Sequence, residues 1–160
     1  MNRVVGINEL IISYEPADVL ITYALGSCLG ITMYDATMKV GGLLHVMLPH
    51  STIDPQKALK NPYIYVDTGV EKMFSELVKH GASMNRLIIK VAGGASFTKP
   101  GDNDLFEIGR RNFTMFRKIL WQKGILINSF DTGGAITRNI SINIGSGIVK
   151  VKSEGIEKYL

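Results

Sequence analysis

Residues 28–48 decide the fold, and they read CLGITMYDATMKVGGLLHVML. Two mostly apolar runs, Leu29–Tyr34 and Val40–Leu48, lie on either side of a polar segment, Asp35–Met38. β-Branched and aromatic residues favour strands, and a short polar segment of this length joins antiparallel strands. The stretch therefore predicts a β-hairpin.

The register of this hairpin decides which side chains face each other across it. If Tyr34 and Lys39 close the loop, Cys28 lies directly opposite His45. Directly opposed residues of an antiparallel pair have Cβ atoms about 4.5–5.5 Å apart, a separation at which a thiol and an imidazole can share a proton. A slip of one residue would separate the two side chains.

The same register sorts the hairpin residues onto two faces. The apolar face is the predicted core and carries Leu29, Ile31, Met33, Val40, Leu44 and Val46. The other face carries Cys28, Gly30, Thr32, Gly41, Leu43 and His45. Gly30 leaves two interpretations open, because missing bulk beside the thiol either makes room for a substrate or marks a place where another element packs closely.

Outside the hairpin, hydrophobic periodicity predicts more strands and two helices. The expected strands are Val4–Ser13, Val19–Tyr23, Leu87–Val91, Ile125–Phe130, Ile140–Ile144 and Ile148–Lys152. The expected helices are Val66–Lys79 and Ile108–Gln122, each followed by a glycine stop signal. Ser51–Pro62 has prolines and no period, which predicts a surface loop. No repeat or linker divides the chain, so we expect one domain over residues 1–160, of the α+β (layered α/β) class.

The composition is that of a folded globular protein. The chain has 160 residues, of which 46% are hydrophobic and 20% charged, and this excludes disordered and low-complexity classes. The net charge of +4 is spread along the chain, which is poor evidence for a nucleic-acid partner and weak evidence for an acidic one. The longest uncharged run is shorter than the roughly 20 apolar residues that span a bilayer. No secretory signal is evident, so we expect a soluble cytoplasmic protein.

Cys28 is the single cysteine, which excludes an internal disulfide and a zinc site built on several thiolates. A free thiol is mostly protonated at neutral pH, and an adjacent imidazole can stabilise the reactive thiolate. Cys28 and His45 are therefore candidates for a nucleophile and its base. The opposing interpretation is an inert buried cysteine beside a structural histidine. A redox sensor at Cys28 would lack a second cysteine within the chain to resolve it.

Several blocks of sequence resemble the chemoreceptor glutamine deamidase family, CheD. The similar blocks are Thr22–Cys28, Gly41–Pro49, Ala92–Ala95, Ile108–Asn112 and Asp131–Gly134 with Arg138 nearby. The resemblance implies hydrolysis of selected glutamine side chains of bacterial chemoreceptors to glutamate and ammonia, a protein-glutamine glutaminase activity. It implies that Cys28 is the nucleophile, His45 the base and Thr22 a third active-site residue.

The resemblance also carries implications for fold and partners. It implies a β-sandwich flanked by helices, similar to the catalytic domain of the cytotoxic necrotizing factor toxins. The implied partners are the methyl-accepting chemotaxis receptors and a CheC-type phosphatase. An alternative role is a non-catalytic binding module that regulates such a phosphatase. No cofactor and no metal are expected.

Other residues near the candidate pair have more than one interpretation. Substrate contacts are expected at Gly26, Ser27 and Gly30, and the backbone N–H groups from Gly26 to Cys28 are the expected oxyanion donors. Two glycines, Gly93–Gly94, are interpreted as a structural turn rather than a phosphate loop, because no Lys-Ser/Thr pair follows. Arg110–Arg111 is either a solvated helix face or a contact for an acidic receptor helix. Asp131 is either a turn residue or an acid supporting the site.

Overall fold

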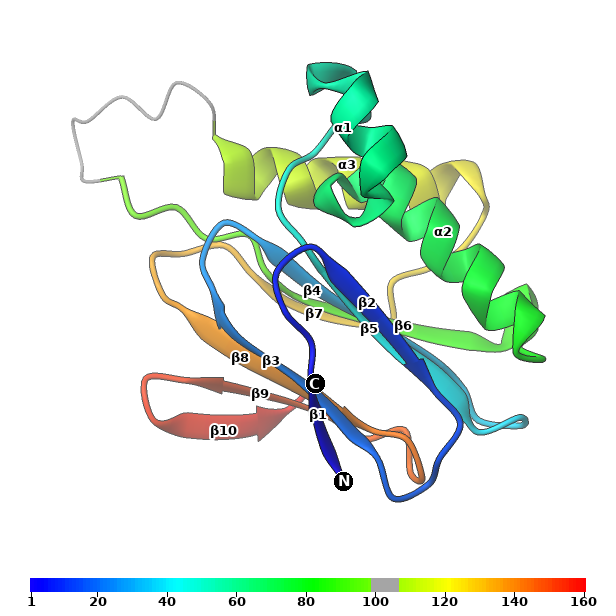
Figure 1. Ribbon diagram of the computed structural model, residues 1–160. Helices are drawn as coiled ribbons and strands as arrows, with labels where there is room; N and C mark the ends of the chain where they lie inside the picture. The colour runs from blue at the N-terminus through cyan, green and yellow to red at the C-terminus, as the bar shows by residue number, and fades with distance from the viewer. Residues whose placement is uncertain (99–106) are drawn as a thin grey trace.

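Two β-sheets packed face to face form the centre of the computed structural model, which describes residues 1–98 and 107–160 (Figure 1). Each sheet has five strands in this part of the chain. Sheet A runs in the order β1 (Asn2–Val4), β3 (Val19–Leu25), β8 (Arg138–Asn143), β9 (Val149–Ser153) and β10 (Ile156–Tyr159). Sheet B runs in the order β2 (Glu9–Ser13), β5 (Val40–Val46), β4 (Leu29–Asp35), β6 (Leu87–Gly93) and β7 (Ser129–Thr132).

The helices lie on the outer face of sheet B, on the side away from sheet A (Figure 1). Two of them, α2 (Val66–Lys79) and α3 (Ile108–Gln122), have the bounds that the sequence predicts. Their apolar faces share one buried cluster with the outer face of β4 and β5. A helical layer on a two-sheet sandwich confirms the predicted α+β class.

The predicted loop over Ser51–Pro62 is wrong, because most of this segment is helical. The structure has η1 (Ser51–Ile53), α1 (Pro55–Lys60) and η2 (Pro62–Ile64). Asp54 caps α1 by accepting a hydrogen bond from the Lys57 N–H, and each proline occupies the first turn of its helix. Proline is tolerated there because the N–H it lacks would have no partner in the helix.

The two faces of the hairpin are sorted as predicted, and both are buried. The face with Leu29, Ile31 and Leu44 packs under α2 and α3. The face with Leu43 and half-buried Cys28 packs against sheet A. All residues of β4 and β5 are buried. The face that the sequence left open is therefore the interface between the two sheets.

The predicted register of the hairpin is wrong, because the loop begins one residue later in the sequence than predicted. Asp35 pairs with Val40, so the loop is residues 36–39 and His45 lies opposite Gly30 rather than Cys28. The Asp35 carboxylate accepts hydrogen bonds from the N–H groups of Thr37 and Met38, which places Asp35 at the strand end and starts the turn one residue later. The loop keeps its length, and the face assignment survives because the shift moves the partner by two residues.

The strand expected over Val4–Ser13 is two strands, because the chain crosses between the sheets at residues 5–8. β1 joins sheet A and β2 joins sheet B. The crossing is fixed by hydrogen bonds from the Val5 N–H to the Ile21 carbonyl and from the Asn8 N–H to the His45 carbonyl. It brings Val5 between the sheets, where it is 1% exposed.

The remaining differences are at strand ends. β7 begins at Ser129, so most of the strand expected over Ile125–Phe130 lies outside the ladder. β10 and η3 (Met84–Arg86) are not predicted from the sequence. The expected β8–β9 pair is present and antiparallel.

Candidate active site

Cys28 lies in the bend between β3 and β4, where the chain passes from one sheet to the other. The Gly94 N–H donates to the Cys28 carbonyl at 2.9 Å, and the Ala95 N–H donates to the Gly26 carbonyl at 2.9 Å. Gly93 has φ +116°, and a Cβ there would lie 2.1 Å from the Cys28 oxygen. Only glycine allows this approach. The glycine pair is thus the structural turn that holds the cysteine bend.

His45 is on β5, 5% exposed, with its ring in the interface between the sheets. Its Nδ1 lies 2.7 Å from Oγ1 of Thr22, which comes from β3 of the opposite sheet. The same hydroxyl donates its proton to the Val5 carbonyl at 2.7 Å. A hydroxyl has only one proton to give, so the imidazole must donate from Nδ1. Neutral His45 therefore carries its proton on Nδ1 and a lone pair on Nε2.

The lone-pair nitrogen of His45 is open to a proton donor. Nε2 is buried and has no hydrogen-bond partner in the described part of the chain. Cys28 packs on the same inter-sheet face, one diagonal step from His45 in the observed register. The thiol makes no hydrogen bond to the ring here, so the predicted direct opposition is replaced by a diagonal neighbourhood.

Burial sets the charge of both groups. It raises the pKa of the Cys28 thiol above its ordinary value, which the residue's own backbone N–H offsets only in part. It lowers the pKa of His45 below its ordinary value. Desolvation disfavours the charged form of each group. At neutral pH the pair is therefore a thiol and a neutral imidazole.

Asn112 on α3 links the backbone just before Cys28 to the backbone just after β5, the strand of His45. Its side-chain N–H₂ donates to the carbonyl of Ser27 and to the carbonyl of Met47, each at 2.9 Å. The first carbonyl precedes Cys28, and the second lies two residues after His45. Asn112 is 0% exposed. Sequence reasoning did not predict this role. The signals were a polar residue on the buried side of an amphipathic helix and its place in the block Ile108–Asn112 that resembles the CheD family.

Arg138 on β8 joins the two sheets at the same end. It is 3% exposed and donates to the Gly93 carbonyl and to the Asp131 carboxylate, each at 3.4 Å. Asp131 lies in β7 and also pairs with Lys158 at 3.2 Å. This ion-pair network holds β6 and β7 against β8. Asp131 is therefore part of the support of the Gly93 turn.

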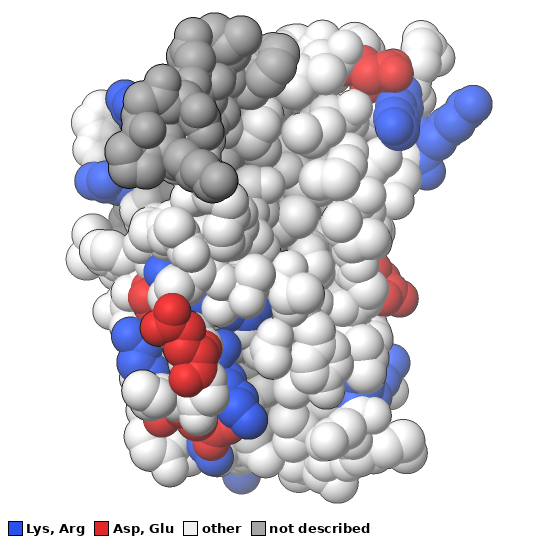
Figure 2. Space-filling model, turned by 90° about the vertical axis from the view of Figure 1, so that its left-hand side faces the viewer, with Lys and Arg blue, Asp and Glu red and all other residues white. Residues whose placement is uncertain are grey.

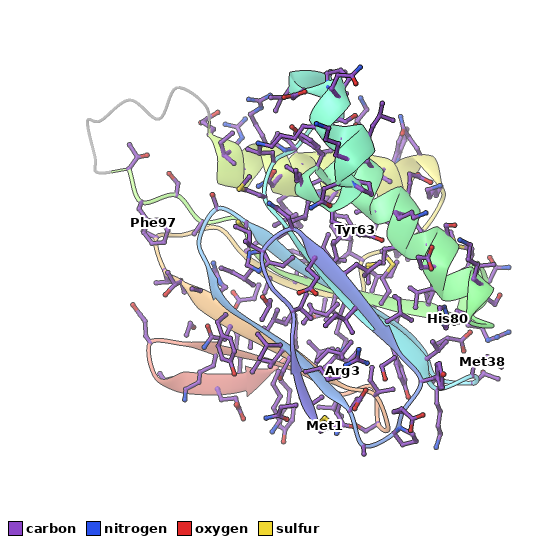
Figure 3. The ribbon with its side chains drawn as sticks, viewed as in Figure 1. Met1, Arg3, Met38, Tyr63, His80 and Phe97 are labelled. Carbon is purple, nitrogen blue, oxygen red and sulfur yellow. The ribbon has the colours of Figure 1, made fainter. Side chains whose placement is uncertain are left out.

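The surface above the bend is a shallow pocket of about 490 Å³, lined by Ser27, Ala95, Ser96, Phe97, Thr98, Ile108 and Gly109. A Cβ on Gly26 would lie 3.1 Å from the Phe97 ring, and Figure 3 shows Phe97 at the end of the sandwich opposite His80. Figure 2 shows this end of the molecule, where charged side chains of both signs gather at the lower left and others lie along the right edge, with a mostly uncharged strip between them.

The three expected substrate-contact residues differ in their surroundings. Gly26 and Ser27 are half-buried, and Ser27 lines this pocket. No N–H of residues 26–28 donates a hydrogen bond to another described residue. Gly30 is buried, and a Cβ on it would lie 2.6 Å from Ile140 and 2.8 Å from Leu25. Of the two interpretations of Gly30, the structure agrees with the second: residues of sheet A pack closely against it.

Two further features bear on the class of site. Among residues 1–98 and 107–160, no group of three or more His, Cys, Asp or Glu side chains is placed to hold a metal ion. No helix in those ranges is long and apolar enough to cross a membrane. A free thiol, an imidazole with an open lone pair and a hydroxyl that orients the ring are the groups that thiol-dependent hydrolysis uses.

Comparison with known proteins gives the family. The family model described as CheD chemotactic sensory transduction matches residues 47–153. A relative from Solibacter usitatus, named a probable chemoreceptor glutamine deamidase CheD, is 43% identical over 157 residues, which cover 98% of this chain and 92% of the relative. The relative of the same name from Thermococcus kodakarensis is 37% identical over 92% of this chain and 90% of its own length. The chain belongs to the CheD family.

Proposed function

We propose that this chain hydrolyses the side-chain amide of glutamine residues in a chemoreceptor, releasing ammonia and leaving glutamate. The observation that carries the proposal is the hydrogen-bond chain from the Val5 carbonyl through Thr22 to His45 Nδ1, which leaves Nε2 unpartnered on the face shared with Cys28. The names of the relatives supply the substrate class.

The first half-reaction forms a thioester. As the glutamine carboxamide enters, the Cys28 thiol proton moves to Nε2 of His45 and the sulfur attacks the amide carbon. The imidazolium then gives this proton to the departing nitrogen, the C–N bond breaks and ammonia leaves. Because the resting pair is neutral, the charges arise only when the substrate is in place.

The second half-reaction releases glutamate. A water molecule replaces ammonia, neutral His45 takes a proton from it at Nε2, and the oxygen attacks the thioester carbon. The C–S bond breaks and the sulfur recovers the proton as a thiol. In both halves the carbonyl oxygen becomes negative. The proposed donors to it are the N–H groups of residues 26–28, which donate to no other described residue.

Thr22 and Asn112 act through other residues rather than on the substrate. Thr22 holds His45 in the tautomer that can accept a proton, as a positioning residue. Asn112 holds the backbone on either side of the pair at a fixed separation. A misplacement of about 1 Å can cost a catalyst on the order of 10²-fold in rate, so these contacts bear on turnover.

The test is turnover on the cytoplasmic domain of a chemoreceptor, followed by ammonia release and by the mass gain that conversion of an amide to an acid produces. Wild-type protein should modify selected glutamines, and Cys28→Ala and His45→Gln should not. Circular dichroism of each variant checks that the fold is retained. Full activity of folded Cys28→Ala would rule out the proposed chemistry.

The family resemblance also implies association with a CheC-type phosphatase, which we propose as a separable second role. The measurement is binding of such a phosphatase to wild-type and Cys28→Ala protein by calorimetry. Equal affinities would show that binding does not need the thiol. Absence of binding by the wild-type protein would remove the partner.

A further inference from the structure

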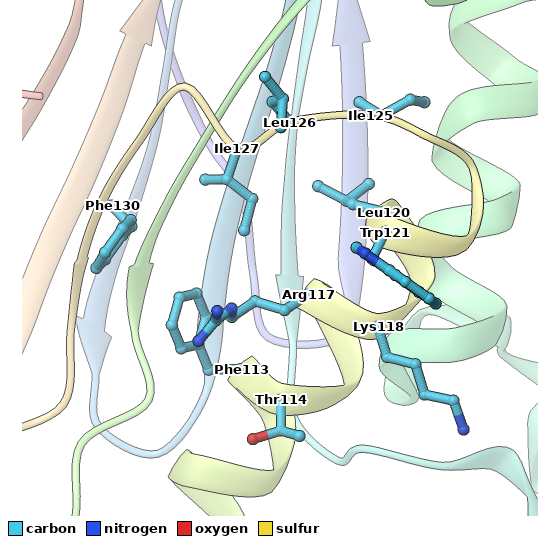
Figure 4. Close-up of a pocket in the computed structure, with 10 residues that line it drawn as sticks. All are labelled: Phe113, Thr114, Arg117, Lys118, Leu120, Trp121, Ile125, Leu126, Ile127 and Phe130. Atoms are coloured by element: carbon cyan, nitrogen blue, oxygen red, sulfur yellow. The ribbon is translucent and has the colours of Figure 1, made fainter.

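An apolar groove lies between α3 and the chain that leads into β7, away from the cysteine bend (Figure 4). It has a volume of about 660 Å³, and its apolar walls include Phe113, Trp121, Leu126 and Phe130. Trp121 and Leu126 are each 82% exposed and Phe130 is 59% exposed. A folded chain seldom leaves several large apolar side chains together in water unless they contact a partner.

The groove is also basic. Arg117 and Lys118 line it together with the apolar residues, and no acidic side chain of residues 1–98 or 107–160 does. Neither cation forms an ion pair with a residue that the structure describes. The Arg117 guanidinium lies 5.7 Å from the centroid of the Phe113 ring, whose centroid is 5.4 Å from that of Phe130. Stacking of this kind holds the guanidinium in place with its N–H groups available to an anion.

The groove continues toward the candidate active site. A second hollow of about 520 Å³ shares Phe113, Thr114 and Arg117 with it and reaches Gly94, whose N–H holds the Cys28 carbonyl. That hollow shares Ser96 with the pocket above the bend, which is lined by Ser27. One acidic residue of the described chain, Glu107, lines it and pairs with Arg110 at 3.3 Å. A connected track therefore runs from Trp121 to the residue before the thiol.

We propose that this track binds the segment of the protein substrate that flanks the reacting glutamine. The segment is amphipathic: apolar side chains enter the wide part near Trp121, and a carboxylate pairs with Arg117. The inference rests on the proposed function. A glutamine side chain alone offers few contacts, so an enzyme that selects particular glutamines has to recognise the surrounding sequence. The track has the charge and the apolar area for that task, and it ends beside Cys28.

The experiment measures kcat and KM on the receptor cytoplasmic domain for wild type, Arg117→Glu, Trp121→Ala and the control Lys60→Glu. Lys60 is an exposed lysine at the end of α1 that lines none of the three hollows. Arg117→Glu should raise KM about tenfold or more, because the new carboxylate repels the substrate carboxylate that pairs with Arg117, and kcat should change little. Trp121→Ala should raise KM less, and Lys60→Glu should stay within about twofold of wild type. Added salt should raise the wild-type KM and narrow the gap to Arg117→Glu.

Equal KM values for Arg117→Glu and Lys60→Glu would overturn the proposal, as would a loss of activity confined to kcat. Affinity of the receptor domain for the same variants in a Cys28→Ala background is measured in parallel. This binding measurement tests the track independently of turnover. If the receptor domain binds in a way that depends on Arg117 but is not deamidated, the proposed chemistry is wrong and the track is not. If Arg117→Glu instead converts a dimer to a monomer without changing receptor binding, the groove is a contact between copies of this chain and the proposal is wrong.

Discussion

Replacing Thr22 with valine keeps the shape of the side chain and removes the one atom that contacts both Val5 and His45. Two buried hydrogen bonds of 2.7 Å are lost. The Val5 carbonyl and the His45 Nδ1–H are then buried without partners, at a cost of about 1–3 kcal/mol each. Small shifts of both groups recover part of this cost, so we expect Thr22→Val to lower the free energy of unfolding by about 2–4 kcal/mol. For a chain of this size the fall in Tm is about 5–15 °C.

The catalytic effect of Thr22→Val has a different origin. Without an acceptor at Nδ1, the ring also populates the tautomer with its proton on Nε2, which cannot accept the proton of the Cys28 thiol. Loss of the tautomer-fixing group of a serine protease costs about 10⁴ in kcat, and there the group is a carboxylate. A neutral hydroxyl orients the ring less strongly, so we expect kcat to fall about 10–10²-fold here.

The assay compares Thr22→Val with Thr22→Ser, which keeps the oxygen and loses only a methyl group. Both are assayed for ammonia release on the receptor domain at a temperature at which circular dichroism shows them folded. Thr22→Ser should stay within a few-fold of wild type. The acid limb of kcat/KM should move to lower pH in Thr22→Val, because the imidazolium loses a stabilising acceptor. Equal kcat values for the folded valine and serine variants would refute the positioning role of the hydroxyl.

The other predictions concern the support of the site and the hairpin. Asn112→Ala removes the donor to two carbonyls and should lower kcat at least tenfold with little change in KM. A fall in kcat accompanied by an equal rise in KM would instead show general unfolding. Gly93→Ala places a Cβ 2.1 Å from the Cys28 oxygen and should destabilise the protein by more than about 2 kcal/mol in urea unfolding, while Gly155→Ala, at φ +76° with open space around it, should cost about 1 kcal/mol. Burial would raise the pKa of Asp35, but Arg86 and backbone N–H groups lower it to about 2. The stability that Asp35 contributes is therefore present above its unfolded pKa and is lost as the pH falls from about 4 to about 2. The free energy of unfolding of the wild type should fall by about 2 kcal/mol over this range. A fall of equal size in Asp35→Asn would contradict this.

Local sequence signals predicted the elements whose bounds do not depend on contacts with other parts of the chain. α2 and α3 have the predicted bounds because an apolar stripe and a terminal glycine are properties of the segment itself. The two faces of the hairpin follow in the same way from the alternation of side chains along a strand. The hairpin register depends on more than the segment. Asp35 is fixed at the strand end by the local N–H groups of Thr37 and Met38. Ser83 and Arg86, which are distant in the sequence, hold the same carboxylate, and a reading of the segment alone does not include them.

The sequence and its resemblance to the CheD family indicate Cys28, His45 and Thr22 as candidate site residues, but they do not give the contacts that hold these residues. The predicted opposition of Cys28 and His45 is wrong, because His45 pairs with Gly30. Thr22 comes from sheet A, and Val5 from a crossing that the sequence presents as one continuous strand. Asn112 contributes from the helical layer. Each of these contacts joins segments that become neighbours only when the layers pack.

The packing of the two sheets accounts for the protonation states of the candidate site residues. His45 and Thr22 meet across the interface between the sheets, and that interface is dry enough to lower the pKa of His45 and to raise that of Cys28. A mostly protonated thiol is a poor target for oxidants, which react with the thiolate. In the proposed mechanism the thiolate forms only as the proton passes to Nε2 beside a bound amide. In that mechanism the protein keeps its single proposed nucleophile, Cys28, protonated until the amide is bound, and the proposed track along α3 would bring the amide to it.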